Sequence, residues 1–266
     1  MKNHLSYLLL GLFGLGIASC NNDGCIDPTA LNYDPNAEKD DGSCVYLAQN
    51  LNFNFVSKMG SADFLINSEV QLNSGRKLEF TRAQMYLCGF RFMGSGGTYQ
   101  VEDPYLLLKT DQQDYNLGYL PVATYDGFSF IVGVDSASNH MNPTLHSSDH
   151  ALSSSNPDHM HWDIDQGYAF IVLEGVVDTS VSMNGNTNAD FRFHIGLDSN
   201  LVDMAFVKEV QSVAEGVTVG LEVDWLALLD GLDMSADSTS RFTRSWDNPN
   251  LADEFVSNVD DAFSLQ

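Results

Sequence analysis

From residue 51 to residue 225 the chain consists of short apolar segments separated by turn-forming residues. Residues 52–56 read NFNFV and alternate polar with apolar side chains, which is the period of a strand with one buried face. Further strands are predicted at 77–80, 85–92, 105–108, 128–134, 168–177, 191–197 and 217–225. Turns rich in Gly, Asn and Ser separate them, for example at 73–75, 94–97 and 184–186. Many short strands joined by turns favour a mainly β fold, an antiparallel β-sandwich or barrel-like domain.

The last residues of the chain follow a helical period instead. Pro249 has an asparagine on either side and is followed by apolar residues at positions 251, 255, 256, 259 and 263. Proline in the first turn after an Asn cap is typical of a helix start. We therefore predict a short amphipathic C-terminal helix.

The N-terminus has the pattern of an export signal. Lys2 is followed by an apolar run over 5–17, and residues 17–20 read IASC. Signal peptides end on small residues, and a cysteine directly after them is typical of bacterial lipoproteins. The run is shorter than the roughly 20 residues that span a bilayer. We predict a signal peptide over 1–19 and acyl chains on Cys20, which would anchor the protein in the outer membrane of a bacterial cell envelope.

Residues 20–48 are turn-rich and acidic, and we expect them to form a stalk between the anchor and a β domain over 49–266. Because an exported protein is oxidised, Cys25 and Cys44 are predicted to form a disulfide. The segment resembles a short GC-x-DP…DDGSC module of exported bacterial proteins. Its acidic side chains alternate over 34–41 as calcium ligands do, but Gly42 falls too late for an EF-hand loop. The sequence is compatible both with a calcium ion bound to this segment and with a metal-free spacer.

The net charge excludes one class of partner, and the remaining cysteine has a structural explanation. The chain carries 12 Lys and Arg against 36 Asp and Glu, a formal net charge of -24. Such a chain repels phosphate, so nucleic acid is not expected as a partner. Cys88 lies in an apolar stretch, where a lone cysteine acts as a small hydrophobic residue.

Histidines are concentrated in one part of the chain. Five of the seven fall between residues 140 and 161, at positions 140, 146, 150, 159 and 161. In an extended segment His159 and His161 would point to the same side. Strand alternation over 191–195 puts His194 on the face opposite the Phe and Ile side chains. Imidazole suits copper, zinc, iron and nickel, but no tight motif such as HExxH is present, so spacing alone leaves a metal site open.

Residues 161–175 read HWDIDQGYAFIVLEG, which resembles the W-x4-GY-x-F-x2-LEG segment of MbnP-like proteins. Further matching segments are 52–55, 79–92, 131–139, 193–196 and 248–263. The resemblance runs from about residue 50 to the C-terminus. MbnP-like proteins are exported and related to the copper-binding partner of methanobactin systems.

The resemblance implies copper binding by histidines near the long polar loop, residues 135–158, and in the strand with the sequence FHxG, residues 193–196. It also implies a tryptophan at or near the copper that a MauG-like dihaem protein oxidises to kynurenine. On this basis Trp162 matches the tryptophan and His194 matches the FHxG histidine. The other expected ligands are His161, His159 and His140. Where a Thr-His-Ser segment is expected before the C-terminal helix, the chain has Thr243-Arg244-Ser245, and arginine stays protonated and cannot ligate a metal.

These features favour a lipid-anchored copper-binding protein that captures or hands over copper and is not an enzyme. One alternative is a metal-free adhesion or partner-binding module that uses the polar segment 135–158. A second is a metal-dependent hydrolase in which Glu174 or an acidic loop residue acts as the base. The sequence has no nucleophile elbow, paired-carboxylate signature or glycine-rich phosphate loop in support of an enzyme.

Overall fold

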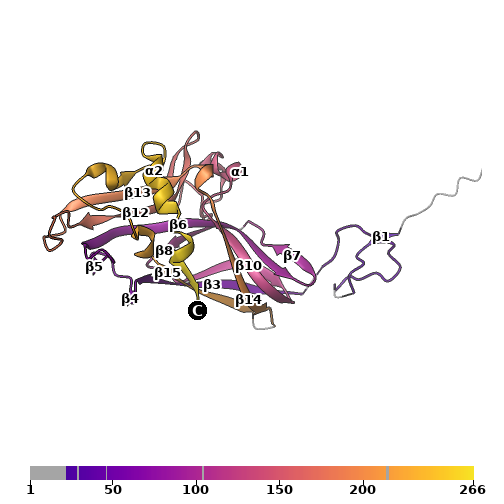
Figure 1. Ribbon diagram of the computed structural model, residues 1–266. Coiled ribbons are helices and arrows are strands. Elements are labelled where there is room, and N and C mark those ends of the chain that lie inside the picture. Colours follow the sequence, from indigo (N-terminus) through magenta and orange to yellow (C-terminus); the bar gives the residue numbers. More distant parts are fainter. Residues whose placement is uncertain (1–21, 29, 46, 104, 214–215) are drawn as a thin grey trace, which may run out of the picture. The chain divides into compact units, whose positions relative to one another are not determined.

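The computed structural model describes residues 22–28, 30–45, 47–103, 105–213 and 216–266 (Figure 1). The predicted signal peptide and Cys20 lie outside the described residues. The chain divides into two compact units, one ending at Leu47 and one comprising Ala48–Gln266. None of the helices among the described residues combines the length and the apolar character that a membrane span requires.

The first unit is closed by a disulfide between Cys25 and Cys44, as predicted. Two short parallel strands, β1 (Asp23–Gly24) and β2 (Lys39–Asp40), bring its ends together. Its acidic side chains form tight turns, because Asp34 accepts the N–H of Asn36 and Asp40 that of Gly42. These hydrogen bonds explain the acidic, turn-rich composition without reference to calcium, which stays a prediction.

The second unit is built on two sheets. The order in the ten-stranded sheet is β14 (Val202–Gln211), β10 (Thr124–Val132), β6 (Lys77–Gly94), β12 (Gly167–Val177), β13 (Ala189–Gly196) and β16 (Phe242–Thr243). Four shorter strands complete this sheet. Three of them pair with β6, namely β5 (Glu69–Gln71), β7 (Gly97–Gln100) and β8 (Leu106–Lys109), and the fourth, β11 (His161–Asp163), pairs with β12. The order in the five-stranded sheet is β17 (Phe263–Leu265), β15 (Val217–Asp224), β3 (Ala48–Met59) and β4 (Ala62–Asp63), with β9 (Asp114–Pro121) also beside β3.

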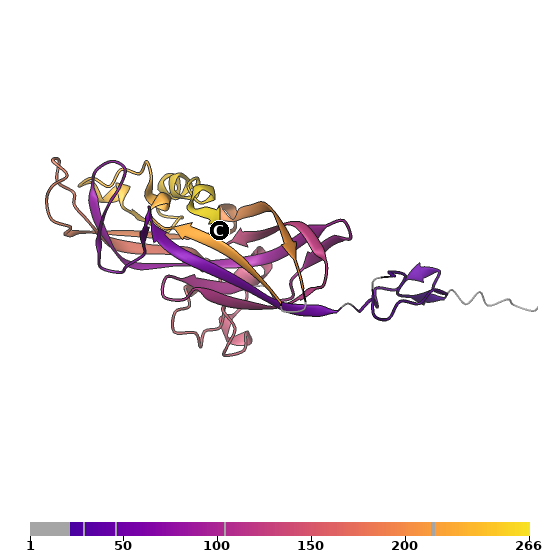
Figure 2. The same ribbon diagram turned by 90° about the horizontal axis from the view of Figure 1, so that it is seen from below.

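Most neighbouring strands of this unit are antiparallel, but β3–β15 and β13–β16 are parallel. Figure 2 shows β3 in violet and β15 in orange lying side by side. The two sheets do not close into a barrel, so of the two predicted alternatives the sandwich-like one is confirmed. The predicted antiparallel arrangement holds for all but these two pairs of this unit.

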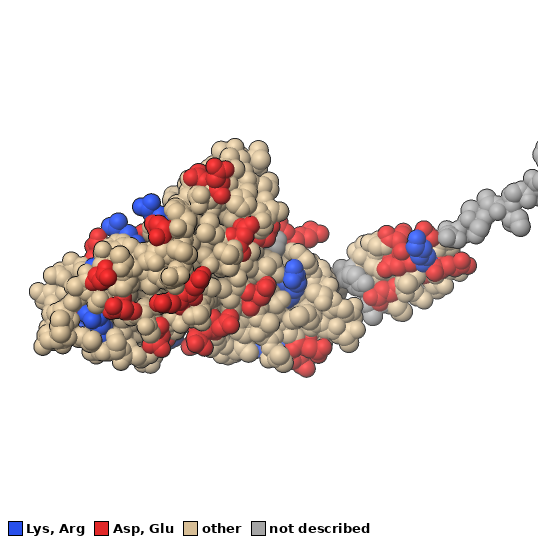
Figure 3. Space-filling model, turned by 45° about the horizontal axis from the view of Figure 1, so that its top comes forward, with Lys and Arg blue, Asp and Glu red and all other residues tan. Residues whose placement is uncertain are grey.

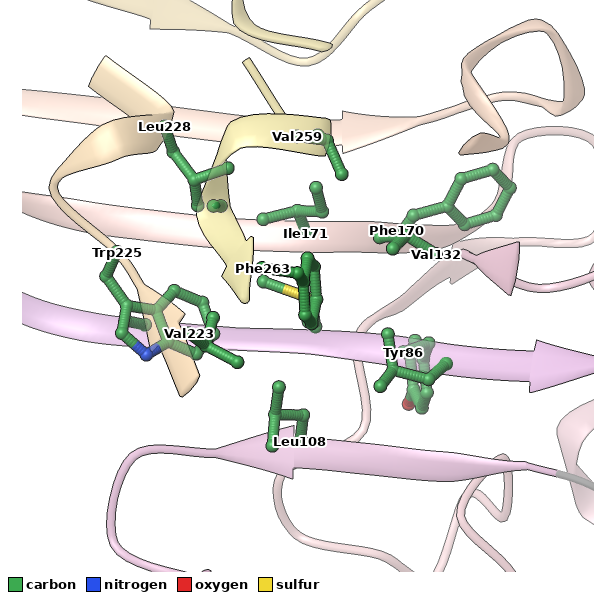
Figure 4. Close-up of a cluster of buried hydrophobic side chains, with 14 of the residues drawn as sticks. Tyr86, Leu108, Val132, Phe170, Ile171, Val223, Trp225, Leu228, Val259 and Phe263 are labelled. Atoms are coloured by element: carbon green, nitrogen blue, oxygen red, sulfur yellow. The ribbon is translucent and has the colours of Figure 1, made fainter. Parts of the chain in front are cut away.

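An aromatic core joins the sheets. Phe53 of β3 lies 5.1 Å from the ring of Phe90 on β6 and 5.7 Å from that of Phe128 on β10. Apolar side chains of both sheets and of the C-terminal segment also meet in one cluster, for example Ile171, Val223 and Phe263 (Figure 4). Burying such side chains contributes about 1.5–3 kcal/mol each to folding.

Two segments that the sequence predicts as separate strands form a single strand in the structure. The segments 77–80 and 85–92 both belong to β6, whose polar middle pairs with β12 from Arg82 to Met85. The strands β9 and β14 were not predicted. Strand β14 lies at a sheet edge, and many of its side chains are exposed, for example Val207 at 94%. Edge strands have no second neighbour, so their apolar pattern is weak.

The C-terminal helix is confirmed but shorter than its apolar pattern. Helix α2 (Pro249–Val256) buries Leu251 and Phe255, and the Phe255 ring stacks 5.1 Å from Phe193 of β13. The chain then forms a 3-10 turn, η5 (Asp260–Ala262), and enters β17, which accounts for the remaining apolar positions. The long polar segment contains only a short helix α1 (Ser136–Asn139) and a 3-10 turn η1 (Pro143–Leu145). Three further 3-10 turns are η2 (Asp198–Asn200), η3 (Ala227–Leu229) and η4 (Ser238–Ser240).

Candidate functional site

Strand pairing brings the sequence-predicted residues to one end of the large sheet. In β11 His161 is opposite Tyr168 of β12, and in β13 His194 is opposite Val172 of β12. Figure 1 shows β12 and β13 next to each other below α2. The histidine segment and the FHxG strand therefore flank the same central strand.

Gly167 and Asn139 fix the beginning of β12. Gly167 has a φ of +72°, and a Cβ there would lie 2.2 Å from Oδ1 of the buried Asn139. That oxygen accepts the N–H of Tyr168 at 2.7 Å, and the Asn139 amide donates to Asp198 at 2.7 Å. The glycine of the GY pair is thus required for a contact that ties the start of the long segment to the strand.

The indole of Trp162 lies against Gly196 of β13. A Cβ added to Gly196 would lie 2.6 Å from Cζ3 of Trp162, so the glycine of the FHxG motif makes room for the indole. Trp246 meets Trp162 edge-on, with ring centroids 4.5 Å apart. Trp246 is 39% exposed and was not singled out from the sequence, because no spacing relates it to Trp162.

His161 carries a buried nitrogen without a hydrogen bond. Its ring packs edge-on against Tyr168, with centroids 4.7 Å apart. Its Nε2 is buried and has no hydrogen-bond partner among the described residues. Burial, and after it the charge of His159, lowers the pKa of His161. The imidazole is therefore neutral at neutral pH, which is the form that binds metal ions.

His159 lies close to His161. Its Nδ1 is 2.7 Å from the carbonyl oxygen of Asn156 and must carry the proton, which leaves Nε2 as the free acceptor. His159, His161 and Trp162 line one open depression, whose other lining residues are Asn142, Pro143, Ser154, Asp163, Ile164 and Asp165. The structure thus brings together two of the four predicted histidine ligands and the predicted tryptophan.

His140 is engaged elsewhere. Its Nδ1 lies 3.0 Å from the carbonyl oxygen of Ile164, and its Nε2 lies 3.6 Å from Oδ2 of Asp198. The hydrogen bond to Ile164 is the main reason why the pKa of His140 is raised. Both contacts favour the protonated ring, which cannot bind a metal ion.

His194 forms a short hydrogen bond to a carboxylate. Its Nε2 lies 2.6 Å from Oε1 of Glu174, and that hydrogen bond is the main reason why the pKa of Glu174 is lowered. Histidines that ligate metals are often held by a carboxylate in this way. Here, however, His194 lines a hollow together with Arg192, Phe242, Thr243, Arg244 and Asp247. Arg244, which stands where the family resemblance leads us to expect a histidine, therefore lies beside His194.

The two remaining loop histidines form a separate pair. The rings of His146 and His150 are stacked, with centroids 4.3 Å apart and planes inclined by 10°. His150 accepts the N–H of Leu152 on Nδ1, and its Nε2 lies 2.9 Å from Asp103. Nε2 of His146 is buried and has no partner within the described part of the chain. This pair does not line the depression that His159 and His161 share.

The predicted ligands do not form one four-histidine site. Among the residues that the structure describes, no group of three or more His, Cys, Asp or Glu side chains is placed to hold a metal ion. His159 and His161 fit a metal best, because one has a free Nε2 and the other a buried Nε2 without a partner. The guanidinium group of Arg244 makes the surroundings of His194 unfavourable for a cation.

Comparison with known proteins identifies relatives of the second unit. The family model named MbnP matches residues 48–245. No curated protein sequence shows significant similarity to the chain. Among solved structures, MbnP from Methylosinus trichosporium is similar, with 14% sequence identity and a TM-score of 0.49. That similarity covers 72% of this chain and 80% of the other.

Proposed function

This chain belongs to the MbnP family, and from that premise we propose that it is a lipid-anchored protein of the bacterial cell envelope that binds copper through His159 and His161. The observation that carries the proposal is the buried Nε2 of His161, which has no partner among the described residues. An unsatisfied buried polar atom costs about 1–3 kcal/mol, and such atoms are rare in native proteins. A copper ion on this nitrogen would remove that cost.

The surroundings of His161 support a copper ion of low coordination number. Two imidazoles with free Nε2 atoms lie on one depression, and imidazole is a common copper ligand. The neutral form of His161 is favoured by its burial, so little proton release is needed before binding. Trp162 lines the same depression, and its oxidation to kynurenine by a MauG-like partner stays a prediction.

Copper titration of the full-length protein in a neutral detergent tests the proposal. His159→Ala and His161→Ala should each abolish the tight binding of one copper ion. His140→Ala is the matched control, because it removes a histidine of the same segment whose nitrogens already have partners. The proposal fails if a variant that lacks both His159 and His161 binds copper as tightly as the wild type.

Exposed apolar residues favour a second candidate function, the docking of a partner protein near the depression. Leu145 is 72% exposed, Ile164 52% and Met141 40%. Large apolar side chains that gather on a surface often mark interaction sites. Copper-independent binding of a partner that Leu145→Ser and Ile164→Ser abolish would favour this function over copper binding.

A further inference from the structure

Arginines gather around β13 and β16 of a strongly acidic protein. Arg82 of β6 and Arg192 of β13 are both opposite Glu174 of β12, and Arg192 is opposite Phe242 of β16. Arg241 and Arg244 flank β16. The chain has only 12 Lys and Arg, and Figure 3 shows mostly acidic side chains on the face in view. The region around β16 is therefore unusual in its density of positive charge.

Phe242 holds two of these guanidinium groups in place. Its ring centroid lies 6.0 Å from Cζ of Arg192 and 5.4 Å from Cζ of Arg241. Arg241 is buried and donates to the carbonyl oxygens of Asp190, Ser235 and Ala236. Its Nε, Nη1 and Nη2 atoms are all used in these hydrogen bonds. Stacking on an aromatic ring restricts Arg192 as well, which lowers the entropic cost of binding a ligand.

Each carboxylate nearby already has a partner, and one of them, Asp247, lines the hollow together with the arginines. Glu174 accepts from His194 at 2.6 Å, Asp190 pairs with Arg192 at 2.9 Å, and Oδ1 of Asp247 accepts the backbone N–H of Arg244 at 2.7 Å. The guanidinium of Arg244 makes no hydrogen bond or ion pair with any residue that the structure describes. Its donors are therefore free, beside Arg192 and His194, in the hollow that all three line.

We propose that this hollow binds a small oxyanion, a carboxylate or phosphate group, on the guanidinium groups of Arg192 and Arg244 beside His194. The planar fork of arginine matches both groups and forms charge-assisted hydrogen bonds with them. The hollow measures about 140 Å³, which is smaller than the 300–1,000 Å³ typical of sites for larger ligands. It accordingly takes a single small anionic group, either as a free ion or as the end of a larger molecule.

Titration of the full-length protein with inorganic phosphate and, separately, with succinate tests this site by calorimetry and by NMR of the arginine side chains. Wild-type protein should bind at least one of the two anions at the Arg244 guanidinium. Arg244→Gln should weaken binding about tenfold or more, because it removes hydrogen bonds from a charged donor. Arg91→Gln is the matched control, since Arg91 is an exposed arginine on β6 that does not line the hollow.

The result separates the two anions and can overturn the proposal. Binding of phosphate alone or of succinate alone identifies the anion that the site prefers. Binding that is equal in the wild type and in an Arg192→Gln, Arg244→Gln double variant would refute the site, as would the absence of binding by both anions. Neither arginine lines the depression with His159 and His161, so this outcome is independent of the copper titration.

Discussion

Replacement of Gly196 by alanine should be costly, because the indole of Trp162 occupies the place of the missing side chain. The added Cβ would lie 2.6 Å from Cζ3 and 2.9 Å from Cη2 of Trp162, and 2.6 Å from the carbonyl oxygen of Tyr168. The ring can tilt away, but the carbonyl belongs to β12, which pairs with β13 at this point. Overpacking of this kind costs about 1–3 kcal/mol, and two simultaneous contacts place Gly196→Ala in the upper part of that range.

Urea unfolding of the full-length protein measures this cost, with Gly96→Ala as the matched control. A Cβ at Gly96 meets nothing within 4 Å, so that variant should stay within about 0.5 kcal/mol of the wild type. In a Trp162→Ala background the cost of Gly196→Ala should fall, because only the contact with the Tyr168 carbonyl remains. If Gly196→Ala costs no more than Gly96→Ala, or the same with and without the indole, Trp162 does not depend on Gly196 as described.

Three further outcomes are expected. Arg244→His should place a second imidazole beside the carboxylate-bound His194 and create an additional copper site. This site is detected as one more bound copper equivalent, which the further change His194→Ala should remove. If no additional copper binds, the two positions do not converge. Cys20→Ser should abolish acylation and release the protein from the membrane fraction, as measured by mass spectrometry of the N-terminal peptide and by cell fractionation, whereas an unchanged membrane fraction would contradict the predicted anchor. Because burial lowers the pKa of His146 and His161 below the value of 6.5 in the unfolded chain, the unfolded state binds more protons below about pH 6.5, and the free energy of unfolding should fall as the pH drops through this window. The urea midpoint, measured between pH 7.5 and pH 5, reports this loss of stability. His146→Phe and His161→Phe should each make the loss smaller than in the wild type. If both variants lose as much stability as the wild type, other groups cause the pH dependence.

Local patterns in the sequence were sufficient for much of the fold. Alternation predicted the inward side chains of β3 and β13, for example Phe53 and Phe193, because a period of two directly reports which face is buried. The disulfide between Cys25 and Cys44 was predicted from the export-signal pattern, because exported proteins are oxidised. Edge strands such as β14 were missed, since exposed positions interrupt their apolar pattern.

The candidate site was harder to predict because it depends on strand register over long sequence separations. The pairing of β13 with β16 places Arg244 in the same hollow as His194, and no local pattern indicates that proximity. Trp246 was missed for the same reason. The density of histidines suggested a single cluster, but backbone carbonyls and carboxylates hold His140, His150 and His194 at separate places.

The parallel pairing of β3 with β15 affects when the protein can fold. Leu51, near the start of the second unit, is opposite Val217, so this strand pair of the small sheet cannot form until most of the chain has been synthesised. Pairings of such long sequence separation form slowly. Until then one edge of β3, the strand that carries Phe53 and Phe55, lacks its partner, and unpaired strand edges make incompletely folded chains prone to aggregation.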